Sequence, residues 1–305
     1  MSQITRNEVE ALIEDQVIRE IFDGVKKQSK ALSLFRKLPN MSSTKTKIRV
    51  SDSLPVSYFL NTEGDNSGRK KLTKMAWKNK FITAGEVAVI IPIKEDLLDD
   101  ADVDIWAEIK PHIIEAFGKT IDEAIFLGNG KPTDWRKGLI PSVVETGKVT
   151  SETNNLYDDI SDTMSQVELS GYNPTALLGG VDLKGKFRKL TDTTGQPLQA
   201  SDVTELPRHF MDNGVWDKSL STMIVGDFSQ AVYSIRQDMT YKVLTEAVIQ
   251  DPETGEILYN LAQDDMVALR VVMRLGWEIP NPVNALDETE TRFPFASLNP
   301  ADGSL

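Results

Sequence analysis

The segment between residues 46 and 84 limits the fold of this chain more than any other part of the sequence. Apolar and polar side chains alternate on both sides of a turn-rich stretch, NTEGDNSG, as they do in two neighbouring β-strands. After the turn, Met75, Trp77 and Phe81 form one face and lysines form the other. The pattern predicts a long two-stranded arm. Because an isolated two-stranded ribbon is only marginally stable, the arm must lie on another part of the protein or on another chain.

The second half of this arm is basic. Between residues 69 and 80 it carries six cations and no acid, in a chain with a net charge of −12. Two interpretations stay open: a solvated strand whose lysines prevent edge pairing, or a surface that meets an acidic partner. The cations are Arg69, Lys70, Lys71, Lys74, Lys78 and Lys80.

A run of acids follows in the stretch IPIKEDLLDDADVDIW. Asp102 and Asp104 have the positions of a helix N-cap and first turn, so free amides and the helix dipole explain them. The spacing lacks the D-x-D-x-D-G pattern of a calcium loop. The remaining acids would repel one another without outside positive charge, and they are Glu95, Asp96, Asp99 and Asp100. We therefore expect the basic arm of one subunit to lie across this acidic face of the next, a heterologous contact that builds rings or larger assemblies.

Periodicity elsewhere predicts a mixed α and β chain. The first part is expected to contain an amphipathic helix over 6–28, a strand over 86–93 and a long helix from Ile105 to Ala124, which Pro111 bends or restarts. A turn-rich boundary over 131–152 separates a second region with a helix, a strand, a helix and a strand. These are expected near 156–167, 175–180, 183–190 and 222–228.

The end of the chain carries a further strong pattern. MVALRVVMRLGW, from Met266 to Trp277, predicts a strand with one buried face and with Arg270 and Arg274 on the other. The tail after Asp287 is expected to be loosely ordered. No stretch of about 18 uncharged apolar residues and no basic, then apolar, leader is present, so neither a membrane span nor a secretory signal is predicted.

The sequence offers little for catalysis. Cysteine is absent, which removes thiolate nucleophiles and thiolate metal sites, and the two histidines, His112 and His209, have no partner motif. GVDLKGKF contains the G-x-x-x-x-G-K part of a phosphate-binding loop at Gly180–Lys186, but Phe187 replaces the hydroxyl that would hold Mg²⁺. A nucleotide hydrolase is kept as the enzymatic alternative. No catalytic, cofactor or metal residue is otherwise assigned, and the chain is not expected to be an enzyme.

The order of these elements resembles the major capsid proteins of tailed bacteriophages with the Hong Kong 97-type fold. The most specific piece, Val87–Pro132, is similar to the family's strand, acidic segment, long spine helix and D-x-A-x-l-x-G-x-G ending, here with Asp122, Gly128 and Gly130. Supporting pieces are KLTDTTGQPL, VGDFSQAVYSIRQ and VALRVVMRLGWEI. Together they cover about residues 5 to 285.

The resemblance implies an α+β fold of four parts and a tail. These are an N-terminal arm (1–45), an extended two-stranded loop (46–84), a peripheral domain with the spine helix (85–150 and 266–290), an axial domain (151–265) and a C-terminal tail (291–305). The axial domain would pack around five-fold and six-fold axes.

It also implies a structural role. The chain would assemble with itself, as hexamers and pentamers, into an icosahedral shell that encloses double-stranded DNA without sequence-specific binding. A portal and separate scaffold or decoration proteins would be its partners, and assembly would occur in the host cytoplasm before the protein becomes part of the virion. An encapsulin-like cage is the related alternative.

Two departures from the family pattern bear on this expectation. Many members carry a long N-terminal scaffolding segment that a protease removes, whereas the arm-like helix here starts at once. Some members join subunits by a Lys–Asn isopeptide bond, and Lys70, Lys71, Lys74, Asn281 and Asn284 lie in suggestive regions. No local motif identifies a reactive pair, so none is assigned.

Overall fold

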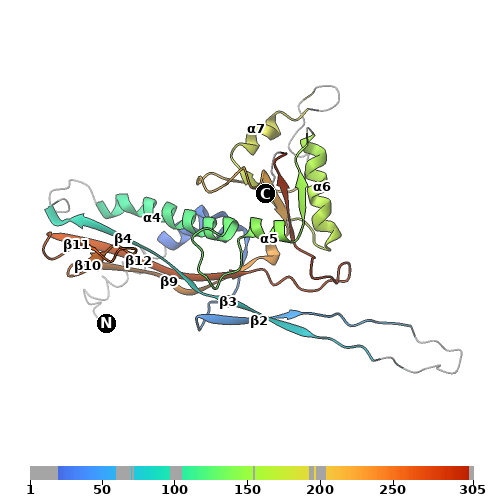
Figure 1. Cartoon of the computed structure of the whole chain (residues 1–305), viewed down its shortest axis with the longest axis horizontal. Helices are drawn as coiled ribbons and strands as arrows, with labels where there is room; N and C mark the ends of the chain where they lie inside the picture. Colours follow the sequence, from blue (N-terminus) through green and yellow to red (C-terminus); the bar gives the residue numbers. More distant parts are fainter. Residues whose placement is uncertain are drawn as a thin grey trace, which may run out of the picture.

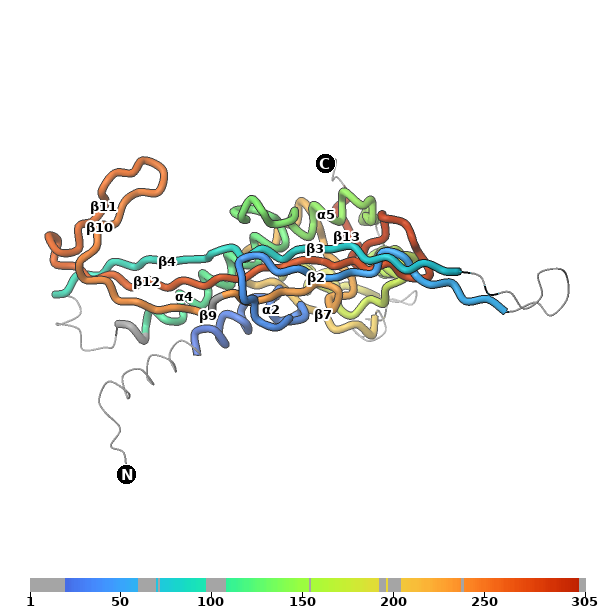
Figure 2. Tube along the Cα trace, turned by 90° about the horizontal axis from the view of Figure 1, so that it is seen from below, coloured from blue at the N-terminus to red at the C-terminus, as the bar shows by residue number. Residues whose placement is uncertain are grey.

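Figure 1 shows a computed structural model of the chain, an elongated α and β molecule with a projecting arm. It describes residues 20–59, 70, 72–96, 105–153, 155–191, 196 and 204–301. Two sheets form two bodies, which we call the four-stranded body and the five-stranded body after their sheets. The two-stranded arm leaves the molecule beside the first body, at the end far from a second hairpin (Figures 1 and 2).

The four-stranded sheet has the order β1 (Arg36–Lys37), β9 (Val232–Leu244), β12 (Met266–Glu278) and β4 (Gly85–Lys94). Figure 2 shows β12 between its two antiparallel neighbours, β4 and β9. The strands predicted at 86–93 and from Met266 are thus confirmed. The expectation of a single buried face on β12 is wrong, because a central strand covered on both sides buries both of its faces. Only Arg270 and Arg274 are exposed along it.

The predicted long helix is α4 (Ile105–Asp122), which continues as a π-helical turn, η1 (Glu123–Leu127). Pro111 lies inside α4 without ending it, so the helix does not restart at that point. It lies along the four-stranded sheet (Figure 1) and buries Ile113, Phe117 and Ile121. Gly128, with φ of 83°, ends the helical run in the left-handed conformation that glycine tolerates. The π turn was not predicted.

The five-stranded sheet has the order β5 (Val149–Ser151), β13 (Phe295–Asn299), β8 (Met223–Gly226), β6 (Ala176–Gly180) and β7 (Arg208–Met211). The predicted helices and strands of this region are confirmed as α6 (Leu156–Leu169), β6, α7 (Leu183–Arg188) and β8. Leu156, Ile160 and Leu183 of the two helices pack with Leu177 and Val225 of the sheet.

Two expectations about this region are wrong. The stretch 131–152 is more than a turn-rich boundary, because it contains α5 (Leu139–Glu145) and β5. The tail is not loosely ordered up to Asn299: β13 is fully buried between β5 and β8. The backbone hydrogen bonds of such a strand are made with residues far away in sequence, so local sequence patterns do not reveal them.

The N-terminal part of the described chain is helical from residue 20 to 28, in agreement with the second half of the predicted 6–28 helix. The first half lies outside the described residues. A short helix follows, α2 (Lys30–Leu34), whose N-cap Ser29 accepts a bond from the Leu32 amide. Helix α2 leads directly into β1 and so brings the chain to the edge of the four-stranded sheet, beside β9.

Asp122, at the end of α4, joins three segments of the chain. Its Oδ1 accepts from Ser29 Oγ (2.7 Å) and Ala31 N (3.0 Å), and its Oδ2 accepts from Lys30 N (3.1 Å) and Asn213 Nδ2 (2.8 Å). The residue is completely buried. Burial raises the pKa of Asp122, and the four hydrogen bonds oppose that rise. The carboxylate thus holds α2, α4 and the loop before β8 together.

Candidate assembly interface

The arm consists of β2 (Lys45–Ser51) and β3 (Trp77–Thr83), paired antiparallel. This ladder is shorter than the predicted one, and residues 54–59 and 72–76 form no strand. It closes where Asp52 N donates to Ala76 O and Ala76 N donates to Ser53 Oγ. Pro55, two residues after Ser53, has no backbone N–H that could continue the pairing.

The two faces of this ladder have different surroundings. Ile82 is buried, Lys80 is half-buried, and the partly exposed Lys78 reaches Glu290 of the body, whereas Trp77 and Phe81 are 60% and 47% exposed and turn to the other side. The register places Lys47 opposite Phe81 and Ser51 opposite Trp77, so basic and aromatic side chains share the outside. We call this surface the outer face of the arm, and it comprises Lys45, Lys47, Arg49, Trp77 and Phe81.

The outer face brings positive charge and aromatic surface together. The Lys45 ammonium lies 4.8 Å from the centre of the Phe81 ring, within range of a cation–π contact. Exposed aromatic residues on a basic strand are costly for a chain that stays alone, since their apolar area remains in water. Sequence reasoning missed Lys45, Lys47 and Arg49 as interface residues because it considered only the run of cations between residues 69 and 80.

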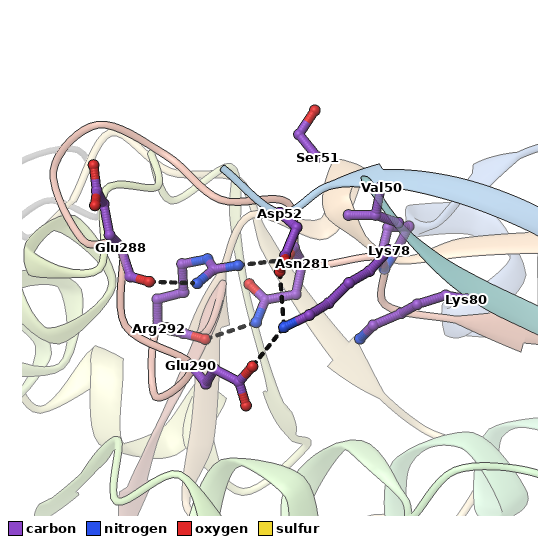
Figure 3. A pocket seen from close by; sticks show the side chains of 10 residues that line it. Val50, Ser51, Asp52, Lys78, Lys80, Asn281, Glu288, Glu290 and Arg292 are labelled. Carbon is purple, nitrogen blue, oxygen red and sulfur yellow. Dashed lines mark hydrogen bonds and ion pairs between the residues drawn. The ribbon is translucent and has the colours of Figure 1, made fainter. Parts of the chain in front are cut away.

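Figure 3 shows the root of the arm, where a cavity of about 340 Å³ separates β2 and β3 from the loop 280–292. The Lys78 ammonium lies 2.7 Å from Asp52 Oδ1 and 2.6 Å from Glu290 Oε1. These two hydrogen bonds raise the pKa of Lys78, and Lys78 in turn lowers the pKa of Glu290. We call this group, Asp52, Lys78 and Glu290, the root clasp, because it joins both strands of the arm to the loop.

Lys80 lies deeper than the clasp. Its ammonium donates to the carbonyl of Ile279 at 3.2 Å, and burial lowers its pKa, with a further lowering by Arg136 and Arg292. Arg292 donates to the carbonyls of Pro282 (3.0 Å) and Asn281 (3.1 Å), which fixes the shape of the loop. Two of the cations predicted to meet a neighbour therefore bind their own subunit.

We expect Glu290→Gln to loosen the arm root at neutral pH and to lose this effect in acid. Because the pKa of Glu290 is lowered in the folded protein, its contribution is present above the ordinary glutamate value of about 4.3 and disappears as pH falls through the lowered value. Amide exchange of residues 77–83, compared between variant and wild type at each pH, measures it. Glu288→Gln, in the same loop but outside the clasp, is the control. Equal exchange at pH 7 would contradict the clasp.

The other predicted interface residues lie apart from the clasp. Lys70 and Lys74 are exposed beyond the ladder, whereas Arg69 and Lys71 lie outside the described residues. Glu95 and Asp96 are exposed just after β4, at the end of the molecule far from the arm (Figure 1). Asp99 and Asp100 lie outside the described residues. Within one chain, the described members of the basic and acidic sets are therefore not brought together.

The acidic end of the molecule includes a hairpin that was not predicted. Strands β10 (Val248–Gln250) and β11 (Ile257–Asn260) lie beside the end of β4 (Figures 1 and 2). The segment 245–260 has four acids, Glu246, Asp251, Glu253 and Glu256, and no Lys or Arg. Val248, Ile257 and Leu258 are at least half exposed on it. This end of the molecule is thus complementary to the arm in charge and also apolar.

The phosphate-loop alternative is not favoured by the local geometry. Gly185 and Lys186 lie within α7 rather than in a loop, and the Lys186 ammonium is 2.5 Å from Glu152 Oε1. The cavity beside them is lined by two lysines, Lys186 and Lys218, and by two acids, Glu152 and Asp182, which offset the positive charge that a phosphate would need.

The histidines and the two asparagines named in the sequence analysis show no arrangement for catalysis or metal binding within the described residues. Over the described ranges, no three His, Asp or Glu side chains come together as a metal site, and no helix has the length and apolar character of a membrane span. His112 is exposed on α4 and His209 is half-buried on β7. Asn281 Nδ2 donates to Arg292 O, and Asn284 Nδ2 donates to Ser170 O, both at 2.8 Å.

Comparison with known proteins gives one consistent result over nearly the whole chain. A model of the phage capsid family matches residues 10–286. The major capsid protein of Staphylococcus phage 80alpha is 27% identical over 292 residues, which cover 92% of this chain and 83% of that protein. A solved chain of Mycobacterium phage Adephagia superposes with a TM-score of 0.79 at 28% identity, over 98% of both chains. One of Microbacterium phage Oxtober96 gives 0.78 at 29%, over 90% of this chain and 91% of that one.

Proposed function

This chain belongs to the phage capsid family and is a major capsid protein that forms the shell of a tailed phage, and on that premise we propose that its arm completes its packing on a neighbouring copy. The observation that carries the proposal is the environment of the two sides of the arm. Lys78 and Lys80 bind partners of their own subunit, while the outer face exposes Trp77 and Phe81 among cations. Burying these rings requires a second surface.

The neighbour's surface is proposed to be the acidic end of the molecule. Glu95 and Asp96 belong to it, Asp99 and Asp100 follow them in the sequence, and the segment 245–260, which contains the β10–β11 hairpin, extends it with four more acids. Arm and acidic end lie at opposite ends of one subunit (Figure 1), so an arm can reach such a surface only on another copy. A contact between two different surfaces is heterologous and generates rings when the rotation closes.

Exposed ion pairs suit this role because they are individually weak. Each contributes about 0.2–1 kcal/mol, so several set the register while a misplaced subunit can still leave. The aromatic side chains add buried apolar area once the register is correct. Salt screens the charges over a Debye length of about 8 Å at physiological ionic strength, so assembly should slow as salt rises.

The finer layout follows the Hong Kong 97-type pattern in our proposal. The four-stranded body with α4 would be the peripheral domain, and the five-stranded body the axial domain around the five-fold and six-fold axes. β13 belongs to the second sheet, so we assign residues 295–299 to the axial domain rather than to a tail. We further propose that the shell assembles in the host cytoplasm with a portal and a separate scaffold, and that it encloses double-stranded DNA. A net charge of −12 suits a wall that does not hold DNA tightly.

The arm contact is tested by reversing charge on the outer face. We expect Lys47→Glu with Arg49→Glu to leave the melting temperature of the subunit unchanged and to lower the yield of closed shells about tenfold, since repulsion replaces several weak attractions in every contact. Electron microscopy and sedimentation of the protein, expressed with its neighbouring head genes, measure the yield. The material that co-purifies identifies the kind of shell: DNA and portal protein indicate a phage head, whereas a cargo enzyme indicates an encapsulin-like cage.

A matched control uses two other exposed cations. Lys242 and Arg270 are direct cross-strand neighbours on β9 and β12, away from the arm. Lys242→Glu with Arg270→Glu makes the same change in net charge and should assemble normally. Unchanged shells from the arm variant would refute the proposed contact, and equal losses from both variants would reduce it to an effect of net charge.

A further inference from the structure

The five-stranded body carries a basic and aromatic hollow that the arm contact does not use. A shallow cavity of about 520 Å³ lies between α7 and the edge strand β7. We call it the α7–β7 hollow, and it is lined by Lys184, Phe187, Arg188, Arg208 and Phe210. Among the residues that the structure describes, no acid lines it, although the chain as a whole has more acids than bases.

The cations of this hollow are held by rings rather than by carboxylates. The Lys184 ammonium lies 5.1 Å from the centre of the Phe210 ring, and the Arg208 guanidinium lies 5.0 Å from that of Phe187. The two rings meet edge to face with centroids 6.5 Å apart. No ion pair to any of the three cations occurs within the part of the chain that the structure describes. Three positive charges around one hollow repel one another until an anionic group enters.

An acidic surface of matching character lies on α6 of the same body. Residues 155–169 contain no Lys or Arg. The exposed side of the helix, which we call the α6 acidic face, comprises Tyr157, Asp158, Asp162, Glu168 and Leu169. Tyr157 is 44% exposed and Leu169 65% exposed, so this face also presents apolar surface. Its carboxylates could pair with the cations of the α7–β7 hollow. Tyr157 and Leu169 could pack against the two phenylalanine rings of the hollow.

The positions of the two surfaces decide how they can meet. In Figure 1, α7 stands on the left of the five-stranded body and α6 on the right. Two different surfaces on separate sides of one body cannot meet within a chain, but they meet between copies arranged around an axis. Every copy then uses both surfaces, and the ring closes without leaving either one free.

We propose that the α7–β7 hollow binds the α6 acidic face of an adjacent copy, so that the five-stranded bodies close into a ring. This inference rests on the proposed function and names the surfaces that make the contact around the axis. A second copy suits the hollow better than a nucleic acid does, because a phosphate backbone needs a long basic track. The neighbouring Lys186 is already paired with Glu152, which limits the basic track.

Charge reversal and its compensation test this contact. Lys184→Glu with Arg188→Glu changes two exposed side chains and should raise the protein concentration needed for shell formation about tenfold, because repulsion replaces attraction at every contact of the ring. Asp158→Lys with Asp162→Lys should do the same. The chain with all four substitutions should assemble near the wild-type concentration, since the charges are exchanged. Light scattering against concentration, followed by electron microscopy, measures all four proteins.

The possible outcomes separate this inference from the proposed function. Wild-type assembly by either charge-reversed variant, or no recovery in the fourfold variant, overturns the contact while the shell-forming role stands. Normal shells that hold less DNA after Lys184→Glu with Arg188→Glu would assign the hollow to nucleic acid and also overturn it. Failure of the wild-type protein to assemble with its neighbouring head genes would instead count against the proposed function.

A second measurement does not depend on charge. The chain has no cysteine, so introduced cysteines form only the intended disulfides. Assembled particles with Lys184→Cys or Arg188→Cys combined with Asp158→Cys or Asp162→Cys should give a ladder of linked chains on oxidation. Particles in which none of the four combinations gives a ladder contradict the contact.

Discussion

Asp122→Ala is expected to lower the free energy of unfolding by about 3–5 kcal/mol, because it removes the acceptor of four hydrogen bonds from a buried site. Ser29 Oγ and the amide of Ala31 are fully buried and would lose their partner without access to water. Asn213 would be released at the same time, so α2, α4 and the loop before β8 would separate. Urea denaturation of the unassembled subunit measures this loss.

The control for this change lies on the same helix. Glu115 is an exposed carboxylate of α4, and Glu115→Ala should change stability by less than about 0.5 kcal/mol. Asp122→Asn is a second, milder variant. The asparagine keeps one oxygen as an acceptor, but its NH₂ group would face the N–H or O–H groups that now donate to the other oxygen. We expect its loss to lie between those of the two alanine variants. Equal stability of Asp122→Ala and wild type would show that the junction contributes nothing.

Gly276→Ala is expected to displace the arm and to destabilise the subunit by about 1–3 kcal/mol, the usual range for overpacking. Gly276 lies on β12 where the root of β3 crosses it. A Cβ atom there would lie 2.4 Å from Thr83 O and 2.6 Å from Ile82 Cγ2. Thr83 O also accepts from the Trp135 indole, so the backbone has little freedom to move. Shell yield should fall with stability, because the arm root is displaced.

Gly185→Ala is the matched control for this glycine. No atom lies within 4 Å of a Cβ placed on Gly185, and the residue is inside α7. Alanine is the better helix former by about 1 kcal/mol, so stability should stay equal or rise. The two proteins are compared by urea denaturation and by electron microscopy of shells. If Gly276→Ala had the stability and shell yield of wild type, the close crossing of β3 and β12 would not position the arm.

The periodic elements were predictable because their signals are local. The spacing of Ile113, Phe117 and Ile121 requires only a helix with one buried face, and α4 has that face. The apolar run over 86–93 and the alternation in β12 predicted two strands in the same way. The order of these elements, with the acidic segment and glycines around α4, was sufficient for the resemblance that the family model later confirmed.

The candidate interface was only partly predictable. The existence and charge of the arm could be inferred from residues 46–84, but the face of β3 that turns outward depends on what lies beneath it. Ile82 packs against Met41 and Val232, and Lys78 finds Asp52 and Glu290, so the lysine phase faces inward. All of these partners are far from β3 in sequence, and only folding brings them into contact with it.

The sequence by itself determined the positions of the strongly periodic elements, such as α4 and β12, because side-chain periodicity and turn residues act over a few positions. It also determined that a basic ribbon and an acidic segment belong to one chain. Only the tertiary structure decided that Asp122 gathers three segments, that β13 lies within the second sheet, and that Trp77 and Phe81 face outward. Those outcomes depend on pairings between residues far apart in sequence, whose energies arise only once the packed sheets bring them into contact.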